Sequence, residues 1–152
     1  MISETFDLWE NTPGLCEEIP TLTAYIPDEK RFEGAVVILP GGGYTHRADY
    51  EGKGYAEFLA GRGITAFVCE YRVYPHMFPL PLLDARRAMR TVRFYAEKYG
   101  ICKDKIAIMG SSAGGHLAAL TATYNEKISF EDIDDIDNED YRPNAHIYYV
   151  IP

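Results

Sequence analysis

Short segments rich in apolar residues recur along the chain, separated by stretches that contain glycine, proline or charged residues. The runs cover residues 21–26, 35–40, 64–70, 105–110 and 145–151. Continuous apolar runs of this length, rich in β-branched residues, are typical of strands buried on both faces of a parallel sheet. The pattern therefore predicts five strands that belong to a largely buried sheet.

Helical periodicity appears between these runs. Residues 51–62 carry Tyr55 and Phe58 on one face. From Leu82 to Tyr99 the apolar positions follow a spacing of 3, 4, 3, 4 and 3 residues, which predicts one continuous amphipathic helix. Strands that alternate with helices are typical of an α/β fold. We expect a mainly parallel sheet with helices on both faces.

Two charged stretches are expected to face solvent. The second helix has four arginines off its apolar stripe, and we expect their stems to pack while the guanidinium groups stay solvated. These residues are Arg86, Arg87, Arg90 and Arg93. Residues 126–144 lack both the EF-hand glycine and a glutamate at the twelfth position from Asp132, so an acidic surface loop is expected, not a calcium loop. Asp84, at the start of the second helix, is expected to interact with the helix dipole.

Length and composition set the broad class. The 152 residues predict a single domain, 1–152, in which residues 1–20 form an N-terminal arm anchored by Trp9. The formal net charge of −8 argues against nucleic acids and anionic membranes as partners. We find no signal-peptide pattern and no apolar run long enough to cross a bilayer. The three widely spaced cysteines favour reduced thiols in a cytoplasmic protein over a disulfide framework or a metal site.

The sequence Gly110-Ser-Ser-Ala-Gly114 lies between an apolar run and a group of good helix formers. A strand, a sharp turn and a helix are the context of a nucleophile elbow, with Ser112 at its centre. Side chains at Gly110 or Gly114 would collide with their neighbours in such a turn. The alternative is a glycine-rich turn in which the serine only caps a helix.

A second glycine motif, Pro40-Gly-Gly-Gly-Tyr44, directly follows the buried run 35–40. A dinucleotide-binding loop would need glycine at the sixth position, where His46 stands, and the lysine of a P-loop is absent. A loop that supplies backbone N–H donors to an oxyanion needs neither feature. We therefore interpret the motif as an oxyanion loop, which favours the nucleophile elbow over the capping turn.

Five short motifs follow one another along the chain. They are Pro40-Gly-Gly-Gly-Tyr44, Glu70-Tyr-Arg-Val73, Leu82-Leu-Asp-Ala85, Gly110-Ser-Ser-Ala-Gly-Gly-His-Leu-Ala118 and Arg142-Pro143. From about residue 20 onward, this order resembles the α/β-hydrolase esterases related to acetyl xylan esterases and the hormone-sensitive-lipase group. The resemblance implies an α/β-hydrolase fold and the hydrolysis of short-chain esters, often acetyl groups on carbohydrates. It also implies that neither a metal nor an organic cofactor takes part.

The resemblance assigns a role to each motif position. Ser112 matches the nucleophile that would form an acyl-serine intermediate. The backbone N–H of Ala113 and those of Gly42 and Gly43 match the oxyanion hole, in which one donor contributes about 3 kcal/mol to lowering the barrier. Tyr44 matches an aromatic residue at the border of the acyl pocket.

The triad acid and histidine of this fold follow the serine along the chain, on later strands. The chain stops at Pro152, so it resembles the amino-terminal half to two-thirds of the fold and is expected to be incomplete at the carboxyl terminus. We therefore expect the strand at 145–151 to pair with a missing carboxyl-terminal segment or with another copy in a homo-oligomer.

The four histidines are poor candidates for the missing base. His116 lies on the helix that leads away from the elbow, and its ring is expected to pack along that helix. His146 is expected at the far end of the last strand, and His76 is expected to be exposed in a proline-rich loop. His46, just past the oxyanion loop, is expected to line the mouth of the substrate pocket but precedes the serine.

Three hypotheses remain from the sequence. The first is a serine esterase of which this chain is a part, acting on a small-molecule or carbohydrate ester. The second is a non-catalytic binding module that keeps the oxyanion pocket but lacks the triad acid and histidine. The third is an oligomer in which another polypeptide supplies these two residues.

Overall fold

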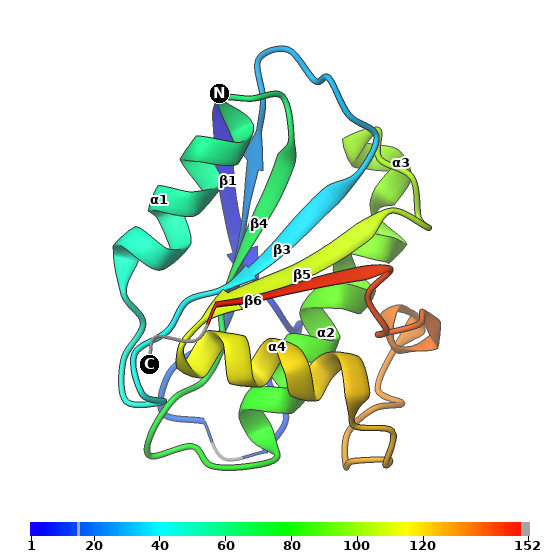
Figure 1. Cartoon of the computed structure of the whole chain (residues 1–152). Coiled ribbons are helices and arrows are strands. Elements are labelled where there is room, and N and C mark those ends of the chain that lie inside the picture. The colour runs from blue at the N-terminus through cyan, green and yellow to red at the C-terminus, as the bar shows by residue number, and fades with distance from the viewer. Residues whose placement is uncertain (15, 150–152) are drawn as a thin grey trace.

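The computed structural model describes residues 1–14 and 16–149, in which six strands form one sheet with the order β1-β2-β4-β3-β5-β6 (Figure 1). The strands are β1 (Ile2–Asp7), β2 (Thr21–Ile26), β3 (Ala35–Leu39), β4 (Thr65–Glu70), β5 (Ile106–Ser111) and β6 (Ala145–Tyr149). The first two strands are antiparallel to their neighbours, whereas β4, β3, β5 and β6 run parallel. The five predicted strands are confirmed, although residues 150 and 151 lie outside the described residues.

The strand β1 was not predicted from the sequence, because its residues carry no apolar run. It occupies the edge of the sheet, where its side chains are exposed or half-buried. An edge strand needs little apolar surface, so periodicity does not reveal it. The segment 1–20 therefore contributes a strand as well as the anchor Trp9, which is buried as expected.

The helices are α1 (Asp49–Ala60), α2 (Leu80–Phe94), α3 (Ala96–Tyr99) and α4 (Ala113–Thr123), and Asp135–Asn138 forms the 3-10 turn η1. The prediction of one continuous helix from Leu82 to Tyr99 is wrong at one residue. Tyr95 leaves the helical conformation (φ −96°, ψ 17°), which separates α3 from α2. Within the described ranges, no helix has the length and hydropathy needed to cross a bilayer.

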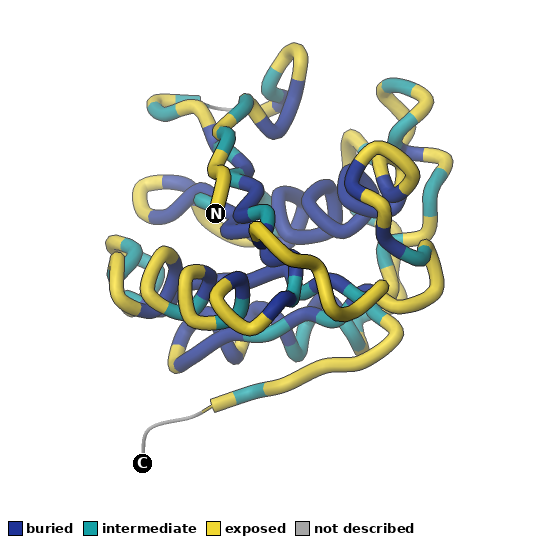
Figure 2. The backbone as a smooth tube through the Cα atoms, turned by 90° about the horizontal axis from the view of Figure 1, so that it is seen from above, coloured by how far each residue is buried: buried dark blue, intermediate teal, exposed yellow. Residues whose placement is uncertain are grey.

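Helices cover both faces of the sheet, as the alternation of patterns predicted. On one face, α1 contributes Ala56 and Ala60 to a cluster with Ile38 and Val68. On the other face, α2, α3 and α4 bury a larger cluster that includes Trp9. Figure 2 shows α2 as buried along most of its length, whereas β6 runs exposed at the margin of the molecule. The two layers leave the carboxyl ends of β3 and β5 together at one edge of the sheet.

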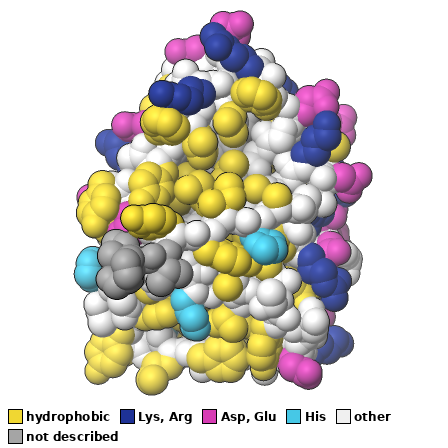
Figure 3. Space-filling view, viewed as in Figure 1, with side chains coloured by type: hydrophobic (Ala, Val, Ile, Leu, Met, Phe, Trp, Pro, Cys, Tyr) yellow, Lys and Arg dark blue, Asp and Glu magenta, His cyan; other side chains and the backbone are white. Residues whose placement is uncertain are grey.

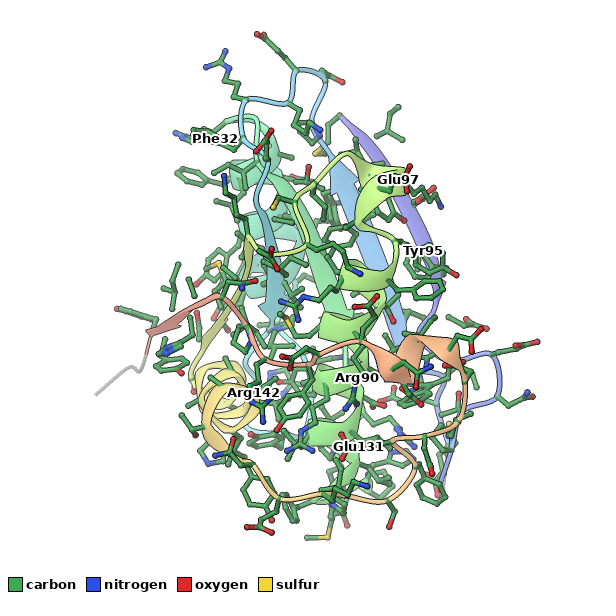
Figure 4. The ribbon with its side chains drawn as sticks, turned by 90° about the vertical axis from the view of Figure 1, so that its right-hand side faces the viewer. Phe32, Arg90, Tyr95, Glu97, Glu131 and Arg142 are labelled. Atoms are coloured by element: carbon green, nitrogen blue, oxygen red, sulfur yellow. The ribbon has the colours of Figure 1, made fainter. Side chains whose placement is uncertain are left out.

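The four arginines of α2 are not solvated, which corrects the expectation from the sequence. Their exposed fractions lie between 1% and 6% because the acidic segment 126–144 folds against the helix (Figure 4). Glu131 forms ion pairs with Arg86 and Arg90 at 2.9 and 3.0 Å. Arg87 binds Asp134 at 2.6 Å. The segment therefore lies at the surface and at the same time covers the charged face of α2.

We expect this cover to be sensitive to acid. A hydrogen bond from Arg87 holds the pKa of Asp134 below its ordinary value. Burial raises the pKa of Glu131, but hydrogen bonds from the Ile128 N–H and from Arg86 lower it by more. The pKa of Glu131 therefore also lies below its ordinary value. A carboxylate with a lowered pKa in the folded state contributes stability that is present above about pH 4 and is lost as the pH falls below that value.

Replacing Arg87 with methionine is therefore predicted to lower the free energy of unfolding by about 2 kcal/mol at pH 7. The deficit should shrink as the pH falls below about 4, because protonated Asp134 no longer interacts with the charged guanidinium. Urea unfolding of the variant and the wild type at a series of pH values measures this difference in the free energy of unfolding. Arg142→Met is the matched control, since Arg142 forms an exposed pair with Asp140 at 3.6 Å. A deficit that is independent of pH would contradict the interpretation.

The outer edge of β6 has no strand partner among residues 1–14 and 16–149. Ile147 and Tyr149 on this strand are 53% and 60% exposed. Figure 3 shows hydrophobic side chains gathered over the middle of the face seen in Figure 1. An exposed apolar edge is a template for pairing with another chain.

We therefore predict that the chain self-associates through β6 in a concentration-dependent way. Ile147→Lys should shift the equilibrium toward monomer because it places a charge in the paired edge. Sedimentation velocity over a range of concentrations measures the effect, with Ile133→Lys, in the acidic segment, as the control. A wild-type chain that stays monomeric at all concentrations would rule the prediction out.

Candidate active site

Ser112 lies at the turn between β5 and α4, as the sequence predicted. Its backbone is in the left-handed region (φ 52°, ψ −121°), which is strained for a residue with a side chain. A Cβ on Gly110 would overlap the carbonyl of Gly114, and a Cβ on Gly114 would overlap that of Leu39. Both glycines are therefore required by the close packing of the turn, and the serine side chain is exposed above it.

The glycine loop after β3 packs directly against this turn. Leu39 pairs with Gly110 in the parallel ladder, so the two loops leave the sheet at the same edge. A Cβ on Gly41 would lie 2.5 Å from the Ser111 carbonyl oxygen, so only glycine allows this approach. Gly42 and Gly43 adopt φ values of 147° and 64°. Residues other than glycine rarely adopt these φ values, so the loop conformation depends on glycine at both positions.

Three backbone N–H groups near the serine are available to a ligand. Those of Gly42, Gly43 and Ala113 donate no hydrogen bond within the described part of the chain. The Ser112 N–H, in contrast, donates to the Tyr149 carbonyl at 2.7 Å, which joins the turn to the end of β6. Unused donors on two adjoining loops are what an oxyanion hole requires.

A pocket of about 330 Å³ opens beside the glycine loop. Its walls come from the loop after β3, the proline-rich loop after β4 and the helix α4. The lining residues are Gly43, Tyr44, Thr45, Tyr74, His76, Met77, Phe78, Pro81, Leu82, His116, Leu117 and Leu120. Tyr44, Tyr74 and Phe78 make the walls largely aromatic, so the pocket suits an apolar group. The structure thus places Tyr44 in the wall of a pocket, and its role at the border of the acyl site stays a prediction.

The BD-FAE family model matches residues 22–152. The chain belongs to this family of α/β-hydrolase esterases. It is 38% identical to the acetyl ester-xyloside bifunctional hydrolase from Caldicellulosiruptor lactoaceticus, with a TM-score of 0.85 over 95% of this chain and 56% of that chain. The propionate-bound esterase Est2 from Thermogutta terrifontis is 28% identical, with a TM-score of 0.80 over 96% of this chain and 53% of that one.

Curated relatives give the same family. The chain is 37% identical over 127 residues to endo-1,4-beta-xylanase B from Butyrivibrio fibrisolvens, which covers 81% of this chain and 19% of that protein. It is 37% identical over 90 residues to the acetylxylan esterase of Xylanibacter ruminicola, covering 59% of this chain and 19% of that protein. The chain thus spans about a fifth of these relatives and just over half of the two solved structures.

In this BD-FAE chain, the Ser112 hydroxyl has no hydrogen-bond partner among residues 1–14 and 16–149. His116 is instead hydrogen-bonded through its Nδ1 atom to the Tyr44 hydroxyl, at 2.6 Å. The His146 ring stacks on Tyr148, with 4.8 Å between the ring centroids. Neither ring is hydrogen-bonded to the serine within the described residues.

His76 is buried, which corrects the expectation of an exposed ring. Its Nε2 accepts a hydrogen bond from the Glu17 N–H at 3.0 Å, and its Nδ1 donates to the Val73 carbonyl at 3.1 Å. Both ring nitrogens are therefore used by the backbone of two loops. His46 does not line the aromatic pocket but a neighbouring hollow of about 490 Å³, together with residues such as Glu17 and Arg47.

A buried ion pair holds the pocket loop of this BD-FAE chain to α2. Arg72 and Asp84 are both fully buried, and the Arg72 Nε donates to Asp84 at 2.9 Å. The Trp9 indole N–H donates to the same carboxylate at 3.0 Å. The expectation that Asp84 only interacts with the helix dipole is therefore wrong. The pair fixes the start of the loop that carries Tyr74 and Phe78, which sequence patterns did not identify as pocket residues.

The oxyanion assignment gives a quantitative prediction for an active form that contains the triad acid and histidine. Gly42→Val should lower kcat about 100-fold with little change in KM, because a Cβ would overlap the His46 carbonyl and misplace the loop N–H groups. Steady-state kinetics on an activated acetyl ester measure the effect. Gly54→Ala is the control, since its Cβ would make only an ordinary contact of 3.8 Å with Tyr50. An unchanged kcat in Gly42→Val would argue against the assignment.

Proposed function

We propose that the protein is a serine carboxylic-ester hydrolase that acts on short-chain, acetyl-type esters of carbohydrates through an acyl-serine intermediate. The observation that carries the proposal is the position of Ser112. Its side chain stands exposed on a strained turn, beside a glycine loop whose N–H groups have no partner within the described residues. Membership of an esterase family supports the same chemistry.

In the proposed reaction, the Ser112 Oγ attacks the ester carbonyl carbon and loses its proton to a general base. The carbonyl oxygen becomes an oxyanion, which the N–H groups of Ala113 and of Gly42 or Gly43 stabilise. Collapse of this intermediate releases the alcohol, which takes a proton, and leaves the acyl-serine. Water then attacks the acyl-serine and releases the acid. The base and its orienting acid would come from residues beyond those described, as the chain order of this fold requires.

Carbohydrate acetates are proposed because of the relatives. One solved relative is an acetyl ester-xyloside hydrolase, and one curated relative is an acetylxylan esterase. The neighbouring hollow with His46, Glu17 and Arg47 offers polar groups next to the aromatic pocket. Thr45 lines both sites, so an ester bound there would have apolar walls and polar groups within its reach.

The test uses a form of the protein extended at its carboxyl end. A fluorophosphonate probe should label Ser112, and labelling should be lost in Ser112→Ala. The same form should release acetate from acetylated xylo-oligosaccharides. If it hydrolyses p-nitrophenyl acetate but releases no acetate from the oligosaccharides, the proposal is restricted to small esters.

A binding module without catalysis is the second candidate. The absence of a hydrogen-bond partner for the Ser112 hydroxyl within residues 1–14 and 16–149 favours it. It predicts that even the extended form resists the fluorophosphonate probe while it binds acetylated oligosaccharides. Calorimetric titration with these ligands, together with probe labelling, separates the two candidates.

A further inference from the structure

The aromatic pocket contains one polar pair whose geometry defines a hydrogen-bond donor. The Tyr44 hydroxyl lies 2.6 Å from His116 Nδ1, and the two rings meet edge to face at 88°. Tyr44 comes from the glycine loop, whereas His116 comes from α4, one turn after the nucleophile. The pair thus connects the two segments that carry the proposed oxyanion donors.

The direction of this hydrogen bond follows from the partners of each group. Burial raises the pKa of Tyr44 to about 12, so the hydroxyl keeps its proton at neutral pH. That proton has no acceptor other than His116 within the described ranges. If His116 Nδ1 carried a proton, the phenol hydrogen would be left without a partner in a half-buried position, which costs free energy. Tyr44 therefore donates, and the neutral imidazole carries its proton on Nε2.

The Nε2–H group has no partner within residues 1–14 and 16–149, and the His116 side chain is exposed in the pocket wall. Apart from the Gly43 N–H of the glycine loop, the other polar groups that line the pocket are engaged or lie at its rim. The Thr45 hydroxyl donates to the Gly42 carbonyl at 3.0 Å, and both nitrogens of His76 are used. Tyr74 is 69% exposed, so its hydroxyl lies in solvent contact.

We propose that His116 is a specificity-determining residue, which Tyr44 holds in the Nε2–H tautomer so that it donates a hydrogen bond to an acceptor oxygen of the bound substrate. His116 lies on the first turn of α4, directly after the nucleophile turn, and its backbone N–H donates to the Ser112 carbonyl at 3.0 Å. The recognised oxygen therefore lies a few bonds from the carbonyl that Ser112 attacks. The inference rests on the proposed function only in taking this pocket as the substrate site. The His116 donor favours esters whose pocket-bound group carries a carbonyl, ether or hydroxyl oxygen over esters whose pocket-bound group is purely hydrocarbon.

The first measurement is the tautomer of His116 in the 152-residue chain. Long-range ¹H–¹⁵N correlation spectra at pH 8 distinguish a proton on Nε2 from one on Nδ1. We expect the Nε2–H pattern for His116 in the wild type and an averaged pattern in Tyr44→Phe, which removes only the hydroxyl. His146, which is exposed on β6 and has no hydrogen bond to its ring nitrogens within the described residues, serves as the internal reference. A proton on Nδ1 in the wild type would overturn the proposal.

The second measurement compares two ligands of the same shape, acetophenone and α-methylstyrene, which differ by an acceptor oxygen in place of a methylene carbon. The wild type should prefer acetophenone. His116→Phe should weaken acetophenone binding about three- to tenfold, the range for one neutral hydrogen bond, and change α-methylstyrene binding less than twofold. His146→Phe should change neither affinity.

Equal effects of His116→Phe on the two ligands, or no effect on either, would overturn the proposal, because the donor would then play no part. A preference for acetophenone that survives in His116→Phe would assign the recognition to the oxyanion loop instead. Neither measurement requires turnover. Loss of the esterase hypothesis would therefore leave these results unchanged, and failure here would leave the esterase hypothesis standing.

Discussion

The 152-residue chain will hydrolyse p-nitrophenyl acetate hardly faster than its own Ser112→Ala variant. A serine hydroxyl is a poor nucleophile at neutral pH unless a base takes its proton as the attack proceeds. Among residues 1–14 and 16–149, no side chain is hydrogen-bonded to this hydroxyl. The turn and the glycine loop can still orient an ester and stabilise the oxyanion. In triad enzymes this residual contribution is about 10³- to 10⁴-fold over water, far below the full rate enhancement.

A form extended at the carboxyl end, with a triad acid and histidine, should hydrolyse the same ester several orders of magnitude faster than the 152-residue chain. Side-by-side assays of both forms and their Ser112→Ala variants measure the difference. Fast hydrolysis by the short chain that disappears in Ser112→Ala would show that it contains its own base. His116 would then be the first residue to replace, because it lies one helical turn from the serine.

Asp84→Ala is expected to lower the free energy of unfolding by about 3–5 kcal/mol. Arg72 and Asp84 are fully buried, and Asp84→Ala removes the carboxylate that pairs with the buried guanidinium at 2.9 Å. The Trp9 indole N–H would lose its acceptor as well. Urea unfolding monitored by the fluorescence of Trp9, the single tryptophan of the chain, measures the change.

Two further variants test whether the loss of stability comes from breaking a buried ion pair and leaving one charge behind. Glu57→Ala removes an exposed ion pair with Lys53 and should change the stability by less than about 0.5 kcal/mol. The double variant Arg72→Met with Asp84→Leu removes both charges, and it should recover a substantial part of the loss because no uncompensated charge remains. If the free energy of unfolding of Asp84→Ala lies within about 1 kcal/mol of the wild-type value, the ion pair is not a major source of stability.

Local patterns predicted the strands and the nucleophile turn because both depend on neighbouring residues. A buried strand needs a continuous apolar run, and the turn at Ser112 needs glycine at positions where any Cβ would overlap the backbone. The charged residues were interpreted wrongly for the opposite reason. Arg86 lies off the apolar stripe of its helix, and only a partner 45 residues later, Glu131, makes its burial favourable. The periodicity of apolar residues within one helix cannot predict a pairing with a residue so far along the chain.

The same distinction applies to the site. Ser112, Gly42 and Gly43 were identified because their motifs constrain the backbone. The donor at His116 was missed, since its role depends on Tyr44, which lies 72 residues earlier. The pocket residues Tyr74 and Phe78 lie in a loop whose prolines indicated only irregular structure. Large apolar side chains at a surface often mark a binding site, but the exposure of these two rings follows from the fold and is not visible in the sequence.

The hydrogen bond from the Ser112 N–H to the Tyr149 carbonyl has a consequence for synthesis of the protein on the ribosome. The strained turn at residue 112 emerges well before the strand that holds its N–H group. Until β6 has been made and has paired with β5, the turn lacks this support, although its glycines are already in place. The nucleophile turn therefore gains this hydrogen bond only after β6 has paired with β5, when the sheet has grown past the strand that carries the serine.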